Sequence, residues 1–479
     1  MSASSPLIYW IRTDFRLQDN AALKAAIETG RPIVPLYLHD RQPEGNWALG
    51  GAAKWWLHQA LEDFLTRWKA KGGRLILRVT DDVLAELSQV IEETGAEAVY
   101  WNRRYEPAGR AVDERVKREL KAAELEVRSF QNELLVEPHT VSTGQGKPYK
   151  VYTPFWKAIK DRPLPAIETP ALDKLRFPSE WPRSEAVEDC ALLPELDWPE
   201  KLATEWQVGE DAAQQRLDRF LDGVVNGYNE ARDIPSEEGT SRLSPYLRWG
   251  HIGPRQVAHR LHAEFDLRQA GPQVYMKELY WREFAYNVLY HFPETADDPL
   301  RPEFKKFPWQ EDAKLLAAWQ RGKTGYPIVD AGMRQLYQTG WMHNRVRMIV
   351  ASLLVKHLLQ PWQAGARWFW DTLVDADLAS NSLGWQWSGG CGADAAPYFR
   401  IFNPITQGEK FDPEGDYVRQ WVPELKKLSN KYIHQPWEAP SGTLQAAGIR
   451  LGEDYPKPII DHKAGRARAL AAFEALKNA

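Results

Sequence analysis

Five short segments in the second half of the chain combine charged, hydroxyl and aromatic side chains at spacings that could do chemistry. The first, residues 239–247, reads Gly-Thr-Ser-Arg-Leu-Ser-Pro-Tyr-Leu. Its two hydroxyl residues flank an arginine just before an expected helix. Hydroxyls, N-terminal amides and a guanidinium all bind phosphate oxygens. We interpret the segment as a phosphate site, with an ordinary helix cap as the structural alternative.

The second segment, residues 278–284, reads Glu-Leu-Tyr-Trp-Arg-Glu-Phe. On a helix, Glu278, Trp281 and Arg282 stand at i, i+3 and i+4, so they share one face. A carboxylate, an indole plane and a guanidinium side by side can bind a base edge, stack on it and hold a phosphate. The structural alternative is a Glu278–Arg282 salt bridge beside a buried tryptophan.

The third segment covers residues 325–330 and 340–348. On a helix, Asn344, Arg347 and Met348 share one face while Arg345 points elsewhere. Arg347 could therefore serve a buried partner, and Arg345 an external phosphate. We interpret His343 as structural, because a lone histidine on a helix more often is.

The fourth and fifth segments are residues 375–387 and 394–412. The paired carboxylates Asp375 and Asp377 are compatible with a metal or with glycoside hydrolysis. No His/Cys ligand set surrounds them and no second acid–base site is present, so we expect neither. The fifth segment interleaves aromatics with Arg and Lys, which is typical of a nucleic-acid rim, although a buried loop looks similar.

Composition limits the class of protein that could carry these segments. The 479 residues have a net charge of −4, so a DNA-binding surface must be a local patch. Two cysteines are too few for a four-thiolate iron–sulfur cluster and fit a reduced compartment. We find neither a signal peptide nor an apolar run of about 20 residues, and therefore expect a cytoplasmic protein without a membrane span. The 22 Trp fit either a Trp-rich core or a role in electron transfer or base stacking.

The first 132 residues are expected to form a parallel sheet with its covering helices. Predicted strands at 7–11, 33–38, 75–79, 98–101 and 126–130 alternate with predicted helices at 20–29, 52–71, 83–94 and 109–123. This alternation predicts a doubly wound α/β domain. The first strand is not followed by G-x-G-x-x-G, so the dinucleotide fingerprint is absent.

The rest of the chain is expected to form a linker and an all-α domain. Residues 133–205 are rich in proline, with one short predicted helix at 153–160, and are interpreted as an interdomain linker. Residues 206–479 carry helical patterns without recognisable strands. The predicted helices include 212–225, 275–291, 330–338, 344–359 and 362–374.

Taken together, in this order and at these intervals, the five segments resemble the DNA photolyase/cryptochrome family, specifically the bacterial cyclobutane pyrimidine dimer photolyases. The resemblance runs from Arg-Thr-Asp-Phe-Arg-Leu-Gln-Asp-Asn at 12–20 to Trp-Val-Pro-Glu-Leu at 421–425, and is densest over 225–425. It implies a carbon–carbon lyase that repairs dimers in DNA by electron transfer from excited, reduced FAD to a flipped-out dimer. We expect a monomer whose partner is dimer-containing DNA.

The resemblance assigns a U-shaped FAD to the helical domain. Asp375 is implied as the salt-bridge partner of Arg347, and Asn381 as the side chain facing flavin N5. An Asp at the Asn381 position, as in plant cryptochromes, would favour different redox states, so Asn381 points to repair. The full implied FAD set is Tyr228, Thr240, Ser241, Arg242, Leu243, Ser244, Trp341, Asn344, Arg347, Phe369, Asp375, Asp377, Asn381 and Trp385.

The resemblance also assigns the substrate site and an electron-transfer chain. Glu278 is implied to hydrogen-bond the dimer. The other implied substrate and DNA contacts are Trp281, Trp387, Met348 and Asn344 around the lesion, and Arg232, Arg282, Arg345 and Arg400 at phosphates. The implied chain that reduces oxidised flavin under light is Trp385, Trp362 and Trp309.

Several positions depart from the family pattern. The usual Asn-Asn-Gly-Gly is Asn-Ser-Leu-Gly at 381–384, the Gly of Asp-Gly-Asp is Ala376, and Tyr275 stands where some relatives have Trp. An antenna pigment is expected near residues 37–40, 52–56 and 106–110. Gly109 replaces the Glu of folate-binding relatives, so a deazaflavin, a second flavin and a differently bound folate all stay open.

Two related functions compete with dimer repair. A (6-4) photolyase would need histidines where this chain has Asn344 and Met348. A blue-light-sensing cryptochrome without repair activity is the alternative function. Glu278, Trp281 and Trp387, together with the Asn near flavin N5, argue against it.

Overall fold

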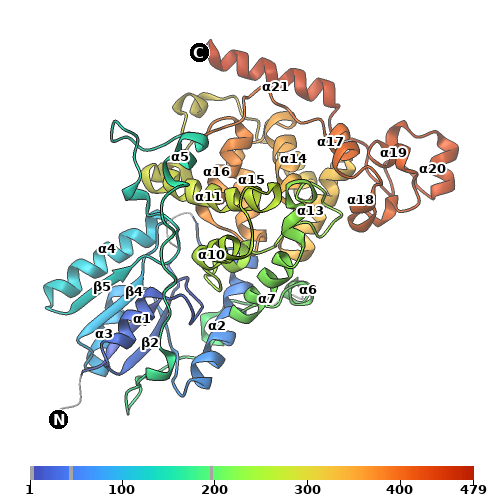
Figure 1. Cartoon of the computed structure of the whole chain (residues 1–479). Helices are drawn as coiled ribbons and strands as arrows, with labels where there is room; N and C mark the ends of the chain where they lie inside the picture. The colour runs from blue at the N-terminus through green and yellow to red at the C-terminus, as the bar shows by residue number, and fades with distance from the viewer. Residues whose placement is uncertain (1–4, 43–46, 195–197, 479) are drawn as a thin grey trace.

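The computed structural model describes residues 5–42, 47–194 and 198–478. The N-terminal sheet with its helices (blue to cyan) and the C-terminal helices (green to red) form two adjoining bodies (Figure 1). The first strand of the sheet and the last helix lie at opposite ends of the molecule (Figure 1). No helix in the described ranges is both long and apolar enough to cross a membrane.

The N-terminal body is a five-stranded parallel sheet with strand order β3-β2-β1-β4-β5. Its strands are β1 (Leu7–Ile11), β2 (Ile33–Asp40), β3 (Ile76–Thr80), β4 (Ala98–Asn102) and β5 (Glu126–Phe130). Its helices are α1 (Ala21–Glu28), α2 (Gly51–Ala70), α3 (Val83–Thr94) and α4 (Pro107–Ala122). The doubly wound prediction is confirmed. In such a sheet the strand order reverses between β1 and β4, and the crevice beyond their carboxyl ends is the usual ligand site.

Local sequence explains why these helices start and stop where they do. Asn20 caps α1 by accepting from the amide of Leu23. Asp82 caps α3, which ends at Gly95 in the left-handed conformation with φ of 63°. These are the preferred residue types at the two ends of a helix.

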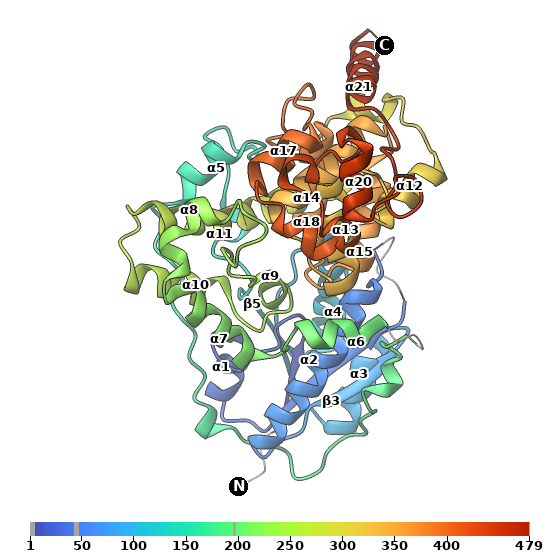
Figure 2. The same ribbon diagram turned by 90° about the vertical axis from the view of Figure 1, so that its right-hand side faces the viewer.

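The segment expected to be a linker is packed against the sheet body. It contains the predicted short helix as α5 (Tyr152–Ile159) and, at its end, α6 (Trp198–Glu205), which was not predicted. The amide of Ile33 donates to the carbonyl of Arg176 at 2.8 Å, and the amide of Glu185 donates to the carbonyl of Leu77 at 2.8 Å. Figure 2 shows the segment running along the outside of the sheet body. The domain boundaries at 132 and 205 stay a prediction.

The C-terminal body is helical, as predicted; within the described ranges its only strand-like pairing is an isolated bridge between Leu451 and Tyr455. Its helices are α7 (Glu210–Leu221), α8 (Tyr228–Ala231), α9 (Ser244–Arg248), α10 (Pro254–Glu264), α11 (Ala270–His291), α12 (Ala313–Gln320), α13 (Pro327–Thr339), α14 (Asn344–Ser352), α15 (Trp362–Thr372), α16 (Leu378–Gly389), α17 (Pro404–Phe411), α18 (Asp416–Trp421), α19 (Asn430–Ile433), α20 (Ser441–Ala447) and α21 (His462–Lys477). The single helix predicted over 344–359 is wrong in one respect. After α14 the chain makes one turn of π-helix, η7 (Leu353–His357), a change of hydrogen-bond pattern that residue periodicity does not reveal.

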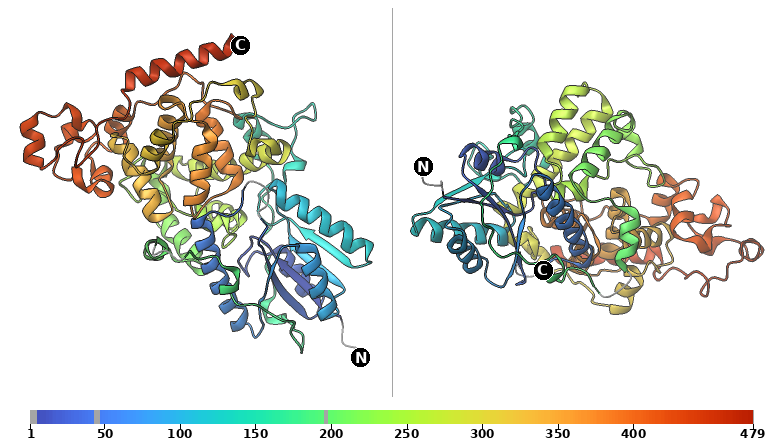
Figure 3. Two further views of the ribbon diagram at one scale, coloured as in Figure 1. Left: turned by 180° about the vertical axis from the view of Figure 1, so that it is seen from behind. Right: turned by 90° about the horizontal axis from the view of Figure 1, so that it is seen from below.

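A shared core joins the two bodies. The indole of Trp56 on α2 donates to Nε2 of His251 at 3.0 Å, and His251 Nδ1 lies 3.2 Å from the carbonyl oxygen of Phe15. Burial lowers the pKa of His251 to about 3, so the ring is neutral, donating through Nδ1 and accepting through Nε2. In the rear view of Figure 3, the start of α2 (blue) meets the orange helices, where Gly51 donates its amide to Asp371 at 2.9 Å.

A second link between the bodies is the buried carboxylate of Glu283 on α11, which accepts from the amides of Leu135 and Val136 at 2.9 Å each. We predict that Glu283→Ala lowers the free energy of unfolding by about 2–4 kcal/mol, because two buried amides lose their acceptor. Urea denaturation followed by circular dichroism measures this. Glu294→Ala, at an exposed position, is the matched control and should change stability little. Equal stability of the two variants would remove this role from Glu283.

Candidate functional site

A cavity of about 520 Å³ lies among the C-terminal helices. Its volume falls in the range typical of cofactor and ligand sites. Segments far apart in the sequence supply its walls, mainly α11, α14, the end of α15 and α16. The lining residues are Arg232, Ser244, Glu278, Trp281, Arg282, Ala285, Asn344, Arg347, Met348, Ala351, Phe369, Leu373, Asp375, Ala376, Asp377, Ser380, Asn381, Leu383, Gly384, Trp385, Trp387 and Ser388.

An ion pair implied by the family resemblance lies in the wall of this cavity. Arg347 Nη2 is 2.8 Å from Asp375 Oδ2, and the same oxygen accepts from the hydroxyl of Ser244 at 2.6 Å. The other carboxylate oxygen, Asp375 Oδ1, is buried and has no hydrogen-bond partner among the described residues. A buried acceptor without a protein partner in the wall of a cavity is available to a donor from a ligand or a water.

The face of α11 that was predicted from residue spacing does turn toward the cavity. Glu278, Trp281 and Arg282 all line it. The alternative salt bridge within the helix is not formed, because Glu278 accepts from Arg232, which lies just after α8. Arg282 instead donates to the carbonyl of Glu133 at 2.7 Å.

Two tryptophan side chains, Trp281 and Trp387, line the cavity from different helices. Trp281 stacks on Tyr152 of α5, with ring centroids 3.7 Å apart and planes 7° from parallel. Tyr152 was missed by sequence reasoning, because α5 lies 129 positions before Trp281 and only the fold brings them together. The stack fixes the orientation of the indole, which suits a planar substrate group. Trp387 lines the same cavity from α16.

The loop predicted to bind phosphate is held by its own side chains. Ser241 Oγ accepts from the hydroxyl of Tyr275 at 2.9 Å, and Tyr275 packs edge-on against Tyr228 at 5.0 Å. Arg242 adopts a left-handed conformation with φ of 50°. Its guanidinium pairs with Glu205 and so is already neutralised. Its assignment to a phosphate stays a prediction.

The same guanidinium of Arg242 lies 4.7 Å from the ring centroid of Trp341. Trp341 is mostly buried, and it belongs to the implied FAD set. Thr240 and Leu243 complete the loop, with Leu243 buried. Their cofactor contacts, like that of Trp341, stay predictions.

Helix α14 presents its residues as their spacing predicted. Asn344, Arg347 and Met348 line the cavity, whereas Arg345 pairs with Asp233 at 2.7 Å. A phosphate bound by Arg345 would have to share it with this carboxylate. His343 has the structural role expected of it: Nδ1 accepts from the amide of Arg345 at 3.2 Å and so caps α14.

Helix α16 places two residues of the implied flavin contact. The side-chain amide of Asn381 donates to the carbonyl of Ala366 at 3.0 Å, which leaves its oxygen available as an acceptor. Trp385 packs edge-on against Phe369 at 5.0 Å. Its ring also contacts α15 so closely that a Cβ on Gly365 would lie 2.1 Å from it.

The remaining members of the implied electron-transfer chain do not line the cavity. Trp362 is one turn before Gly365 on α15 and is 1% exposed. Trp309 is half-buried and packs against Phe307 at 4.4 Å. Trp319, which sequence reasoning missed, lies 6.0 Å from Trp385. The chain Trp385, Trp362, Trp309 stays a prediction.

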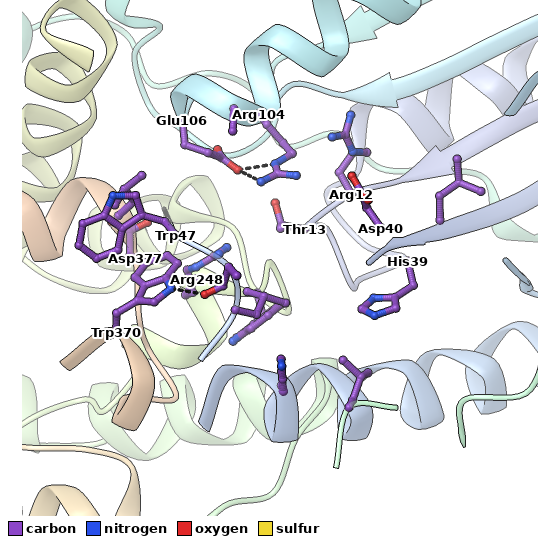
Figure 4. Close-up of a pocket in the computed structure, with 18 of the residues that line it drawn as sticks. Arg12, Thr13, His39, Asp40, Trp47, Arg104, Glu106, Arg248, Trp370 and Asp377 are labelled. Atoms are coloured by element: carbon purple, nitrogen blue, oxygen red, sulfur yellow. Dashed lines mark hydrogen bonds and ion pairs between the residues drawn. The ribbon is translucent and has the colours of Figure 1, made fainter. Parts of the chain in front are cut away.

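A second cavity, of about 490 Å³, opens between the sheet and the helical body (Figure 4). It lies beyond the carboxyl ends of β1, β2 and β4, where a doubly wound sheet binds ligands. The lining residues are Arg12, Thr13, Tyr37, Leu38, His39, Asp40, Arg41, Gln42, Trp47, Ala48, Leu49, Lys54, Arg104, Glu106, Ala108, Cys190, Ala191, Leu192, Arg248, Trp249, Tyr286, Trp370, Asp377, Leu378 and Ala379. Residues 37–40, 52–56 and 106–110, where the resemblance implied an antenna pigment, supply part of the sheet side of this cavity. The rest of the sheet side and the whole helical side were not predicted, and the place of the pigment stays a prediction.

Charge on the walls of the second cavity is partly paired. Arg104 and Glu106 form an ion pair, drawn as dashed lines in Figure 4. Burial alone would raise the pKa of Glu106, but the guanidinium groups of Arg104 and Arg248 lower it to about 2. Asp377 lines both cavities and accepts from the hydroxyl of Tyr286 at 2.5 Å.

The paired carboxylates Asp375 and Asp377 each have partners within the protein. Within the described ranges, no group of three or more His, Cys, Asp or Glu residues is arranged to hold a metal ion. Asp377 caps α16 by accepting from the amide of Ser380 at 2.7 Å, and Asp375 is the partner of Arg347.

Comparison with known proteins gives consistent matches over both bodies. Residues 7–171 match the model described as DNA photolyase, and residues 275–475 match the FAD binding domain of DNA photolyase. The chain is 50% identical to a deoxyribodipyrimidine photo-lyase of Agrobacterium fabrum, covering 99% of this chain and 98% of that one. It is 37% identical to cryptochrome-1 of Arabidopsis thaliana, over 96% of this chain and 69% of that one.

A solved structure agrees with the computed one. The crystal structure of a bacterial class III photolyase from Agrobacterium tumefaciens superimposes with a TM-score of 0.95 at 49% identity, over 99% of this chain and 98% of that one. The first cavity fits FAD on its own evidence. Its volume is in the range typical of cofactor sites, Asp375 Oδ1 is an acceptor without a protein partner, and Asn381 has an oriented amide oxygen.

We predict that Asp375→Asn lowers the FAD content of the purified protein about tenfold, because Arg347 and Ser244 lose the charge that orients them. The ratio of flavin to protein absorbance measures this. Asp416→Asn, at an exposed carboxylate of α18, is the control and should keep full FAD content. Full FAD content in both variants would show that the Arg347–Asp375 pair does not hold the cofactor.

Proposed function

Because the chain belongs to the DNA photolyase/cryptochrome family, we propose that it is a deoxyribodipyrimidine photo-lyase, which uses light to repair cyclobutane pyrimidine dimers in DNA. Reduced FAD, when bound, supplies the photoexcited electron that opens the cyclobutane ring. One observation carries the proposal. The candidate dimer contacts Glu278, Trp281 and Trp387 line the same cavity as the candidate flavin contacts Asn381 and Asp375.

The chain's own residues bind the extruded dimer, orient it and shield it from water. Trp281, fixed by its stack on Tyr152, offers a flat surface to an extruded base. Glu278 accepts a hydrogen bond from the base edge, and Arg232 keeps its carboxylate in place. Arg400 is exposed on the segment after α16. In this proposal Arg400, Arg282 and Arg345 contact phosphates of the strand that flanks the dimer.

The alternative function is blue-light sensing without repair. The chain is similar to cryptochrome-1 at 37% identity, so membership of the family does not separate the two functions. The site does favour repair. Asn381 rather than Asp stands in the wall of the cavity, and Glu278 lines it together with Trp281 and Trp387.

Light-dependent loss of dimers tests the proposed function directly. Reduced protein is mixed with an oligonucleotide containing one thymine dimer, and dimers are counted after illumination and after equal time in the dark. We expect repair only in the light. Illuminated protein that holds reduced FAD yet removes no dimers would favour the sensing function.

We predict that Glu278→Gln keeps its FAD but binds the dimer-containing oligonucleotide about tenfold more weakly, because the amide oxygen still accepts the hydrogen bond but no longer carries the charge that strengthens it. The number of dimers repaired per absorbed photon should also fall. Glu238→Gln, at an exposed position before the phosphate loop, is the control. A variant at Glu278 with unchanged affinity and unchanged repair per photon would remove that residue from its role.

We further propose that the second cavity holds an antenna pigment. Arg12, Arg41, Lys54, Arg104 and Arg248 outnumber the carboxylates of Asp40, Glu106 and Asp377 on its walls. The indoles of Trp47 and Trp370 pack edge-on at 5.4 Å beside them. Arg12 and Arg41 are paired with Asp113 and Asp81, which do not line the cavity. Aromatic walls with guanidinium and ammonium groups suit a flat chromophore with an anionic tail, which would exchange such internal partners for its own charge. A deazaflavin, a folate and a flavin all have that chemistry.

A variant that fills the second cavity distinguishes the antenna site from the FAD site. We predict that Ala108→Phe, on the cavity wall at the start of α4, removes absorbance not due to FAD and lowers repair at the antenna wavelength. FAD content and repair driven by FAD absorption should stay unchanged. Ala111→Phe, one turn along α4 at an exposed position, is the matched control. An antenna retained by the Ala108 variant would place the pigment elsewhere.

We place the protein in a reducing compartment, the cytoplasm, as a monomer. Its two cysteines, Cys190 and Cys391, are buried and free. Free thiols in this setting fit a cytosolic redox environment. Size-exclusion chromatography with light scattering tests the oligomeric state.

A further inference from the structure

Lys356 is a buried charge that the proposed repair reaction does not use. It lies in the π-helical turn η7, between α14 and α15, and is 1% exposed. No carboxylate of the described residues forms an ion pair with it. Burying an ammonium group without a counter-ion is costly. A π-helical turn often marks a functional position, so both features call for an explanation.

Two contacts connect the amine of Lys356 to the segment that follows α16. Nζ donates to the carbonyl of Gly389, the last residue of α16, at 3.1 Å. Nζ also lies 3.3 Å from the centroid of the Tyr398 ring. Both contacts are close to proposed substrate residues, since Gly389 is two positions after Trp387 and Tyr398 is two positions before Arg400. One side chain thus holds both ends of segment 389–398.

Other parts of the protein also hold this segment, through its backbone carbonyls and through the ring of Tyr398. Arg301 donates its amide to the carbonyl of Cys391 at 2.9 Å and its guanidinium to the carbonyl of Gly390 at 3.1 Å. The Tyr398 ring stacks on Phe473 of α21, with centroids 4.5 Å apart and planes 13° from parallel. The C-terminal helix therefore supports the ring on which the Lys356 amine rests.

We propose that Lys356 is a positioning residue for the substrate. Its ammonium group holds segment 389–398 so that Trp387 and Arg400 flank the mouth of the cavity in the geometry that binds dimer-containing DNA. This inference rests on the proposed function. It adds a residue that touches neither FAD nor DNA and acts through the segment it holds.

The charge of this amine depends on pH near neutrality. Burial lowers the pKa of Lys356 to about 7. The groups that face it do not replace its charge: burial raises the pKa of the Cys391 thiol to about 12, and Arg301 is paired with Glu303 at 2.8 Å. On the α21 side, Arg468 donates to the carbonyl of His357, whose ring bonds that of His462 at 2.8 Å. A neutral amine still donates a hydrogen bond but loses its attraction to the Tyr398 ring.

Stability and DNA binding should then respond to pH in opposite directions. Between pH 7 and about 10.4, the unfolded chain keeps a proton on Lys356 that the folded chain has lost. This difference makes the fold more stable as pH rises through that window. Any weakening of DNA binding over the same window therefore does not come from unfolding through this group.

We expect the affinity of the wild-type protein for a thymine-dimer oligonucleotide to fall about tenfold from pH 6 to pH 8.5. Lys356→Met should bind about tenfold more weakly at pH 6 and lack this pH dependence. Lys356→Arg, which stays charged, should keep its affinity to pH 8.5. Repair per photon of dimers already bound should be the same in all three proteins.

Lys431→Met is the matched control. Lys431 lies 5.1 Å from the Tyr432 ring on the exposed α19, so this variant removes a similar pair away from the cavity. Tyr398→Leu is a second test that leaves the lysine in place, and it should also abolish the pH dependence. If Lys356→Met fails to fold, the pH dependence of DNA affinity in Tyr398→Leu and Lys356→Arg tests the inference.

Wild-type pH dependence in the Tyr398→Leu or Lys356→Met protein would overturn this inference, as would wild-type affinity at pH 6 in Lys356→Met. Failure of the proposed function is a separate outcome, seen when the wild-type protein with reduced FAD repairs no dimers in the light.

Discussion

Two cavities of about 500 Å³ lie within this chain, and charged side chains line each of them. These charges need partners of opposite sign. Removing a charge from water is costly unless a partner of opposite sign compensates for it. Arg347 is paired with Asp375, Arg232 with Glu278, and Arg104 with Glu106. These pairs keep the walls rigid around space that a cofactor or substrate needs. They also concentrate polar groups that can exchange an internal partner for a bound one.

The position of α16 sets the geometry of both cavities. Asp377 caps the helix and lines both cavities, while Asn381, Trp385 and Trp387 follow along its length. A pigment in one cavity and a flavin in the other would thus share a wall, which favours energy transfer from the first to the second. The close contact of Trp385 with Gly365 fixes α16 against α15.

The substrate side is stabilised from further away. Tyr152 of the segment between the bodies fixes Trp281, and η7 with α21 supports the segment after Trp387. Side chains that do not line the cavity therefore support those that do. Damaged DNA is recognised largely through its backbone and its distortion, so a rigid rim with few base-specific contacts suits such a substrate.

The sequence by itself determined the strands of the sheet, most of the helices it was used to predict, and which residues share a helix face. Alternation of apolar runs and helical patterns predicted the five strands and the helical second body. Spacing alone placed Glu278 with Trp281, and Asn344 with Arg347, because a helix has a fixed period of 3.6 residues. The family resemblance supplied the pairing of Arg347 with Asp375, which the structure confirms.

Only the tertiary structure decided which charges pair and which segments meet. Glu278 pairs with Arg232, 46 positions away, rather than with Arg282 on its own helix, and Arg242 pairs with Glu205. The π-helical turn at Lys356 and the helical wall of the second cavity were likewise not predictable. Local periodicity carries no information about partners that only packing brings together, and a buried charge takes whichever partner the fold places within reach.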